Sequence, residues 1–126
     1  MKTAVDLTPE EIAEYRTFAR RRDEQEQHRL RLREERAWEL ARRAAALLRE
    51  EFGATRVVVF GSLVHKGCFT PWSDVDIAAW DIRPDDTLRA IGAVMDISPD
   101  IPLQLVDVAA CCPDLRVEIE TEGMDI

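Results

Sequence analysis

The run Val57-Val58-Val59-Phe60-Gly61-Ser62 decides the fold of this chain. Four consecutive apolar residues, three of them β-branched, predict a short strand that is buried on both faces. Gly61 allows the backbone to turn sharply where the strand ends and to approach a ligand closely. Ser62 adds a hydroxyl group beside the N–H groups of that turn. The run therefore predicts a buried strand that ends in a turn suited to holding phosphate.

A pair of carboxylates follows eleven residues later, in Ser73-Asp74-Val75-Asp76-Ile77. On a strand, Asp74 and Asp76 point to the same face, roughly 6–7 Å apart. Two carboxylates opposite a Gly-Ser turn can ligate a Mg²⁺ ion that also contacts triphosphate oxygens. The alternative is that both aspartates simply face solvent at the edge of a sheet. The ordered combination of strand, Gly-Ser, short loop and strand-borne aspartates favours the metal site.

The remaining pattern predicts an α+β chain, or an α/β chain with a small mixed sheet. Thr8 and Glu11 form a capping box for a helix that no Gly or Pro interrupts before Gly53. Further strands are expected over residues 75–80 and 103–108, and helices over residues 87–95 and 113–121. The expected order is helix, strand, strand, helix, strand, helix, and the first helix is unusually long.

The long helix has two halves of different character, which predicts a charged helical arm over residues 1–34 and a globular domain over residues 35–126. The second half carries an apolar stripe at helical spacing, expected to pack on the domain: Trp38, Ala41, Ala45, Leu48 and Phe52. The first half is polar except for a small apolar patch: Ile12, Tyr15, Phe18 and Ala19. Either this half is a solvated helix held by ion pairs, or the patch docks on a second protein or a second copy.

Composition narrows the function classes. The net charge is −8, and all of it falls in residues 53–126, where 13 acidic residues face 5 basic ones. Such a surface repels nucleic-acid phosphates, so no direct nucleic-acid partner is expected. No apolar run approaches the length of a membrane span, and no signal-peptide pattern is present. The three cysteines fit no disulfide framework, and the cytoplasm is the expected location.

Around these motifs the sequence resembles the DNA polymerase β-like nucleotidyltransferase superfamily, and within it the minimal nucleotidyltransferases. The resemblance is carried by residues 57–62, residues 72–77 and the C-terminal stretch from Val106 to Gly123, and it covers roughly residues 50–126. It implies that Gly61 and Ser62 hold the triphosphate of ATP or another NTP and that Asp74 and Asp76 hold Mg²⁺. It also implies transfer of a nucleotide, most often AMP, to a partner protein. Members of this group are usually antitoxins whose partner is a helical HEPN-type toxin.

The pattern of that group is not complete in this sequence. Enzymes of the superfamily carry a third carboxylate on the last strand, where this chain has Gln104, and the nearest acid, Asp107, should point to the opposite face. An amide neither accepts a proton near neutral pH nor neutralises a cation. Two functions therefore remain open: an enzyme that transfers a nucleotide, and a catalytically degenerate antitoxin that neutralises its partner by binding alone.

Three further side chains near the motifs have two interpretations each. Lys66 lies in a loop that is one residue longer than is usual in the group, and it either reaches phosphates or is solvated. The same choice applies to His65. Trp72 either stacks on a nucleobase or, as is more common for such a residue, packs over the edge of the sheet.

Overall fold

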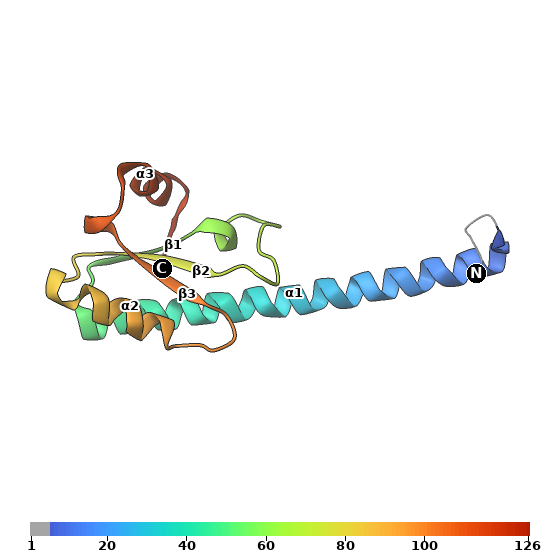
Figure 1. The fold of residues 1–126 in the computed structure, drawn as a ribbon, viewed down its shortest axis with the longest axis horizontal. Coiled ribbons are helices and arrows are strands. Elements are labelled where there is room, and N and C mark those ends of the chain that lie inside the picture. The colour runs from blue at the N-terminus through green and yellow to red at the C-terminus, as the bar shows by residue number, and fades with distance from the viewer. Residues whose placement is uncertain (1–5) are drawn as a thin grey trace. The chain divides into compact units, whose positions relative to one another are not determined.

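The computed structural model describes residues 6–126 as an α+β fold built on one four-stranded mixed sheet. Its elements in chain order are α1 (Pro9–Phe52), β1 (Arg56–Phe60), β2 (Val75–Trp80), α2 (Thr87–Met95), β3 (Leu103–Asp107), α3 (Pro113–Glu122) and β4 (Met124–Asp125) (Figure 1). The predicted fold class, a small mixed sheet flanked by helices with a long N-terminal helix, is confirmed. The two-residue strand β4 was not predicted, because it is too short to show an alternating pattern.

Local signals set both ends of α1. The hydroxyl oxygen of Thr8 accepts a hydrogen bond from the backbone N–H of Glu11 at 3.1 Å, which confirms the predicted cap. At the other end Gly53 adopts φ +70°, and the N–H of Ala54 donates to the carbonyl oxygen of Leu48 at 3.1 Å. This is the left-handed glycine stop that the sequence predicts.

The chain divides into two units between Leu32 and Arg33. In the first unit, residues 1–5 lie outside the described residues, and the helical residues are largely exposed. Tyr15 and Phe18 of the apolar patch expose 68% and 65% of their surfaces, so nothing in the described chain covers them. Within residues 6–126, none of the helices combines the length and the apolar character needed to cross a membrane.

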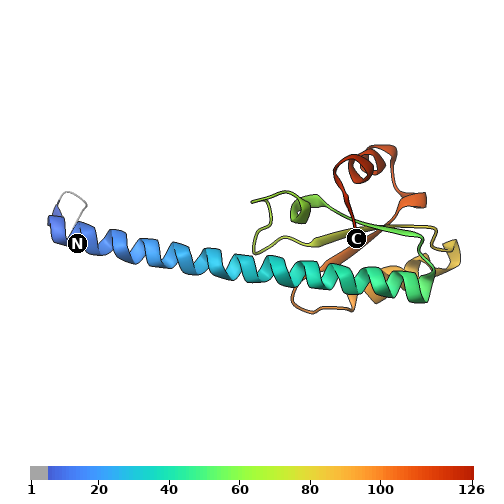
Figure 2. The ribbon, with the colours of Figure 1, turned by 180° about the vertical axis from the view of Figure 1, so that it is seen from behind.

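The sheet of the second unit has the strand order β3-β2-β1-β4. β1 pairs antiparallel with both β2 and β4, whereas β2 and β3 run parallel and are joined through α2. Seen from behind, β1 and the strands beside it lie between α3 and the C-terminal part of α1 (Figure 2). All four residues from Val57 to Phe60 are buried, as predicted for a strand covered on both faces.

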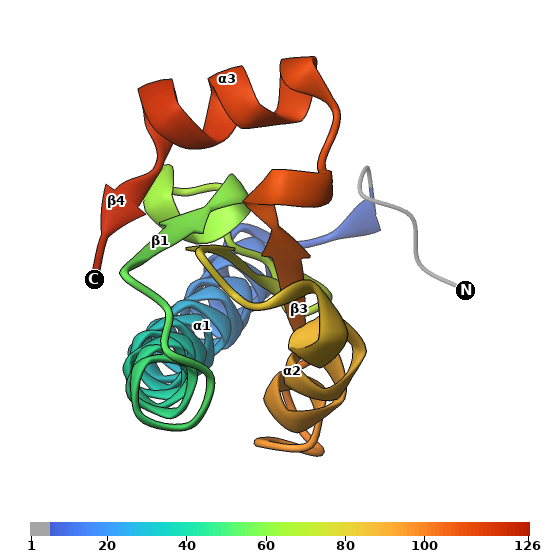
Figure 3. The same ribbon diagram turned by 90° about the vertical axis from the view of Figure 1, so that its left-hand side faces the viewer.

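Helices cover the two faces of the sheet unequally. Figure 3 shows α3 on one face and, on the other, α2 beside the part of α1 that belongs to the second unit. On the α3 face, Ile119 packs in a buried cluster with Val58, Phe60, Ala78 and Val108. On α1 the buried residues are Ala37, Leu40, Ala41, Ala44, Ala45, Leu48 and Phe52. Of the predicted stripe, Ala41, Ala45, Leu48 and Phe52 are buried, and Trp38 is half-buried beside the buried Ala37.

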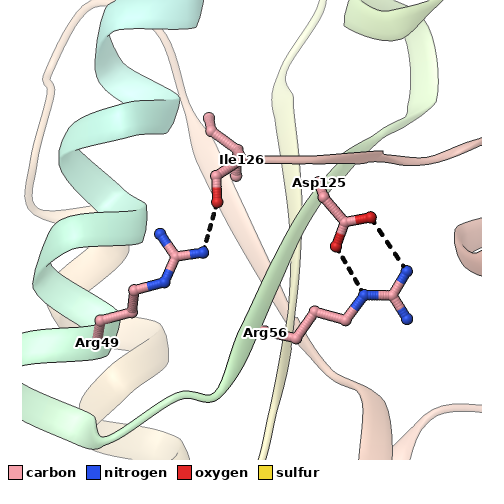
Figure 4. A network of polar contacts seen from close by, with 4 residues as sticks. All are labelled: Arg49, Arg56, Asp125 and Ile126. Carbon is pink, nitrogen blue, oxygen red and sulfur yellow. Dashed lines mark hydrogen bonds and ion pairs between the residues drawn. The ribbon is translucent and has the colours of Figure 1, made fainter.

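Polar contacts hold β4 at the edge of the sheet (Figure 4). The guanidinium group of Arg56 donates to both carboxylate oxygens of Asp125, at 2.7 and 3.3 Å, and Arg49 donates to the carbonyl oxygen of Ile126. The hydrogen bond from Arg56 holds the pKa of Asp125 below its ordinary value. The guanidinium carbon of Arg56 also lies 4.5 Å from the ring centroid of Trp80, so the Arg56 side chain is held between Asp125 and Trp80.

Candidate functional site

Strand register brings the candidate residues together on the α3 face of the sheet. Asp76 is paired with Phe60 on one neighbouring strand and with Gln104 on the other. Directly paired residues share a face, so the side chains of Asp76 and Gln104 lie on the same face as Phe60. Because Gly61 follows Phe60 directly, the glycine turn lies beside the Asp76 carboxylate.

The contact between Gly61 and Asp76 is close enough to require glycine. A Cβ atom at position 61 would lie 2.4 Å from Oδ2 of Asp76, and Gly61 adopts φ +77°. Any other side chain would therefore displace the carboxylate and strain the backbone. The turn that the sequence predicts thus packs directly against one of the two predicted aspartates.

Asp74 comes directly before β2, and its side chain meets Gln104. The amide Nε2 of Gln104 donates to Oδ2 of Asp74 at 2.9 Å. Gln104, and not Asp107, is therefore the β3 residue beside the aspartate pair. One oxygen of Asp74 is occupied by an amide donor in the position where the resemblance implies a third carboxylate.

Asp107 lies on the other face of the sheet. Its Oδ1 accepts a hydrogen bond from the N–H of Ala109 at 3.1 Å, and its Oδ2 accepts one from the hydroxyl of Thr87 on α2 at 2.8 Å. Both oxygens stabilise local structure, one at the turn after β3 and one at the start of α2. Asp107 is therefore excluded as a third carboxylate beside Asp74 and Asp76, because its side chain lies on the opposite face of the sheet.

The environment of Asp76 disfavours its negative charge. Desolvation, then the neighbouring Asp74 carboxylate, then Glu118 of α3 raise the pKa of Asp76 to about 6. Within the described part of the chain, no ion pair or hydrogen bond to another side chain compensates the Asp76 carboxylate. Glu118 was not identified from the sequence, because it is one of several acids on a mostly exposed helix. An added cation would relieve the repulsion in this acidic cluster.

This environment predicts how stability depends on pH without metal. The pKa of Asp76 is near 6 when folded and 3.8 when unfolded, so the folded protein holds its proton more tightly. The associated stability is present below about pH 4 and is lost as the pH rises through 6. In EDTA, Asp76→Asn should therefore exceed the wild type in unfolding free energy at pH 7, by about 1 kcal/mol after allowance for solvent screening. Urea unfolding at pH 7 and at pH 4.5 measures the difference in unfolding free energy between Asp76→Asn and the wild type, which should be smaller at pH 4.5. An equal difference at both pH values would contradict the raised pKa of Asp76.

The turn after β1 carries the remaining predicted residues. Residues Gly61–Val64 form a short 3-10 turn in which Ser62 is half-buried. Lys66 is exposed beyond the turn, and Nε2 of His65 lies 3.4 Å from the carboxylate of Glu122 on α3. Lys66 is thus free to reach a ligand from this loop, whereas His65 has an acidic neighbour.

Trp72 does not pack over the edge of the sheet. It exposes 86% of its surface. Its backbone N–H donates a hydrogen bond to the hydroxyl of Thr70 at 3.2 Å. The packing role that the sequence favours for this residue is therefore wrong. An exposed tryptophan two residues before Asp74 is an available flat surface for a ligand ring.

Asp74 and Asp76 offer two carboxylates, which suits Mg²⁺ better than a metal ion that needs all of its ligands from the protein. No group of three or more acidic, histidine or cysteine side chains in residues 6–126 is arranged to bind a metal ion. Mg²⁺ is commonly held by one or two carboxylates, with substrate phosphates and waters completing its octahedron. Asp74 and Asp76 supply two such carboxylates, so they could hold a Mg²⁺ ion whose remaining ligands come from outside the protein.

Fold and side chains together define a small α+β domain with a candidate paired-carboxylate site on the α3 face of a mixed sheet. No protein-family model matches the chain, and no curated protein matches it. Among solved structures it is similar to one described as "Structure of putative minimal nucleotidyltransferase", with 25% sequence identity and a TM-score of 0.47, over 79% of this chain and 94% of that one. That score is too low to establish a shared function.

Proposed function

We propose that this domain binds a Mg²⁺-nucleoside triphosphate at Gly61, Ser62, Asp74 and Asp76 and transfers a nucleotide, AMP in the first instance, to a partner protein. The observation that carries the proposal is the packing of the Gly61 turn against the Asp76 carboxylate, which the sequence motifs predict. A phosphate-binding turn and a metal-binding acid must be adjacent if one ion is to touch both the protein and the triphosphate.

The proposed roles follow from the chemistry of each group. The turn at Gly61 and Ser62 holds phosphate oxygens, Asp74 and Asp76 bind the ion, and Lys66 adds positive charge from the loop. The metal ion, when bound, neutralises charge on the phosphates during the reaction. A hydroxyl oxygen of the acceptor attacks the α-phosphorus, the bond to the β-phosphate side breaks, and pyrophosphate leaves as the hydroxyl proton is lost to solvent. By holding that ion, Asp74 and Asp76 would fix the triphosphate in position for this in-line attack.

Thermal unfolding tests the nucleotide site directly. Mg²⁺-ATP at about a hundredfold excess over its Kd should stabilise the wild type by about 2.7 kcal/mol and raise its Tm by several degrees. The double variant Asp74→Asn/Asp76→Asn should show no such rise, since neutral amides bind Mg²⁺ poorly. Asp85→Asn removes an exposed carboxylate outside the site and should respond like the wild type. Equal shifts in all three proteins would rule out the proposed site.

A second candidate is binding without transfer, and one contact favours it. Gln104 donates to Asp74, in the position where an acid would otherwise help to activate the attacking hydroxyl. An amide cannot take the proton, and loss of general-base assistance typically costs about 10²–10⁴ in rate. Under this candidate the domain is a degenerate antitoxin that occludes its partner.

The proposed partner is a helical HEPN-type toxin, and the proposed location is the cytoplasm. Exposed Tyr15 and Phe18 of α1 are the proposed contact for that partner or for a second copy. Incubation of the co-purified complex with ATP labelled on the α-phosphate separates the two candidates. Label on the partner that disappears with Asp76→Asn supports transfer, whereas a stable complex without label supports occlusion.

The variant Tyr15→Ser/Phe18→Ser should weaken the complex under either candidate.

A further inference from the structure

Arg33 contacts the loop that carries Asp74. It is the first residue of the second unit, and its Nη2 donates to the carbonyl oxygen of Ser73 at 3.2 Å. Its guanidinium carbon lies 5.8 Å from the ring centroid of Phe69, which is only 1% exposed. The sequence provides no signal for this residue, because it is one of many arginines in a charged helix.

The oxygen that Arg33 binds belongs to the peptide group joining Ser73 to Asp74. On the other side of Asp74, the N–H of Val75 donates to the carbonyl oxygen of Pro102 at 2.9 Å. Both peptide planes that flank the Cα atom of Asp74 are therefore held from outside the loop. Because peptide groups are planar, holding both of them sets the direction of the bond from Cα to Cβ of Asp74.

We infer that Arg33 is a positioning residue for Asp74: it holds the Ser73–Asp74 peptide so that the Asp74 carboxylate projects toward Asp76 and the Gly61 turn. The inference rests on the proposed nucleotide site. Stability alone does not explain Arg33, since its Nε is buried without a hydrogen-bond partner among the described residues. Leaving such a donor unpaired is unfavourable, and an apolar side chain of similar length would avoid it.

The test compares Arg33→Met with Arg36→Met in the full chain. Arg36 lies on the same helix and pairs with Glu39 at 3.4 Å, so the control removes an equal charge that does not hydrogen-bond to Ser73. Calorimetry well below the Tm should show about tenfold weaker Mg²⁺-ATP binding in Arg33→Met, the usual effect of losing a group that orients a metal ligand. Binding in Arg36→Met should stay within about twofold of the wild type.

Hydrogen exchange supplies the second measurement, which does not depend on nucleotide. In Arg33→Met the Val75 amide, which donates to Pro102, should exchange faster than in the wild type, while β1 amides keep their rates. A purely structural role would lower the Tm without changing either affinity or local exchange. Wild-type affinity together with wild-type exchange in Arg33→Met would overturn the inference. If the wild type itself fails to bind Mg²⁺-ATP, the proposed function fails, and the exchange result still decides whether Arg33 positions Asp74.

Discussion

Replacing Gly61 by alanine should weaken Mg²⁺-ATP binding about 100-fold while leaving the protein folded. The new Cβ would lie 2.4 Å from Oδ2 of Asp76, and that carboxylate is the mobile end of a side chain. It would rotate away at modest cost, so the free energy of unfolding should fall by about 1 kcal/mol, mainly from the positive φ. A carboxylate displaced from its productive position should raise the Kd about 100-fold. Isothermal titration calorimetry with Mg²⁺-ATP measures the loss.

Gly67→Ala is the matched control for this experiment. Gly67 has φ +80°, lies in the same loop region, and has no atom within 4 Å of an added Cβ. Both variants therefore incur the same backbone penalty, and only Gly61→Ala displaces Asp76. Nucleotide binding to Gly67→Ala should stay within about threefold of the wild type. Similar losses in the two variants would show that loop strain, and not the Asp76 carboxylate, controls binding.

Replacing Gly123 by alanine should give the largest loss of stability. An added Cβ would lie 2.3 Å from both the carbonyl oxygen of Ile119 and Cγ1 of the fully buried Val58. Neither contact can yield easily, because one is helix backbone and the other is packed core. The same glycine leads α3 into β4, so a shift there also strains the Arg56–Asp125 pair. Unfolding free energy should drop by about 2–3 kcal/mol, or roughly 10 °C in Tm.

Gly92→Ala shows whether this loss is steric. Gly92 lies inside α2, and an added Cβ there has no neighbour within 4 Å. Alanine is the better helix former, so this variant should gain about 0.5–1 kcal/mol. Opposite signs for the two glycines, measured by urea unfolding, support the packing argument. A Gly123→Ala protein as stable as the wild type would contradict the close approach of α3 to β1.

Secondary structure was largely predictable because it follows local patterns. Helix α2 has the predicted bounds, and α1 begins and ends at the predicted cap and glycine. On α1, Ala37 is buried and Trp38 only half-buried, because helical periodicity locates a stripe but not its centre, which depends on what packs against it. The short strand β4 depends wholly on its pairing with β1, and no pattern within two residues could reveal it.

The candidate site was predictable only in part. The approach of Gly61 to Asp76 could be expected, since the turn and the aspartate belong to strands that follow each other in the sequence. The contributions of Glu118 and Arg33 could not, because each comes from a helix that reaches the site only through packing. The exposure of Trp72 is also a tertiary result, since the same residue could equally have covered the sheet.

The sequence by itself determined where the helices and the strands β1 to β3 begin, that β1 is buried on both faces, and that Asp74 and Asp76 alternate with apolar residues at the start of β2. These properties depend on side-chain periodicity and turn chemistry over a few residues, which act before any distant contact forms. Only the tertiary structure decided that the Gln104 amide donates to Asp74 and that Arg33 holds the peptide before Asp74. Strand register and helix docking join segments that are 30 to 40 residues apart, and their geometry comes from packing the whole core.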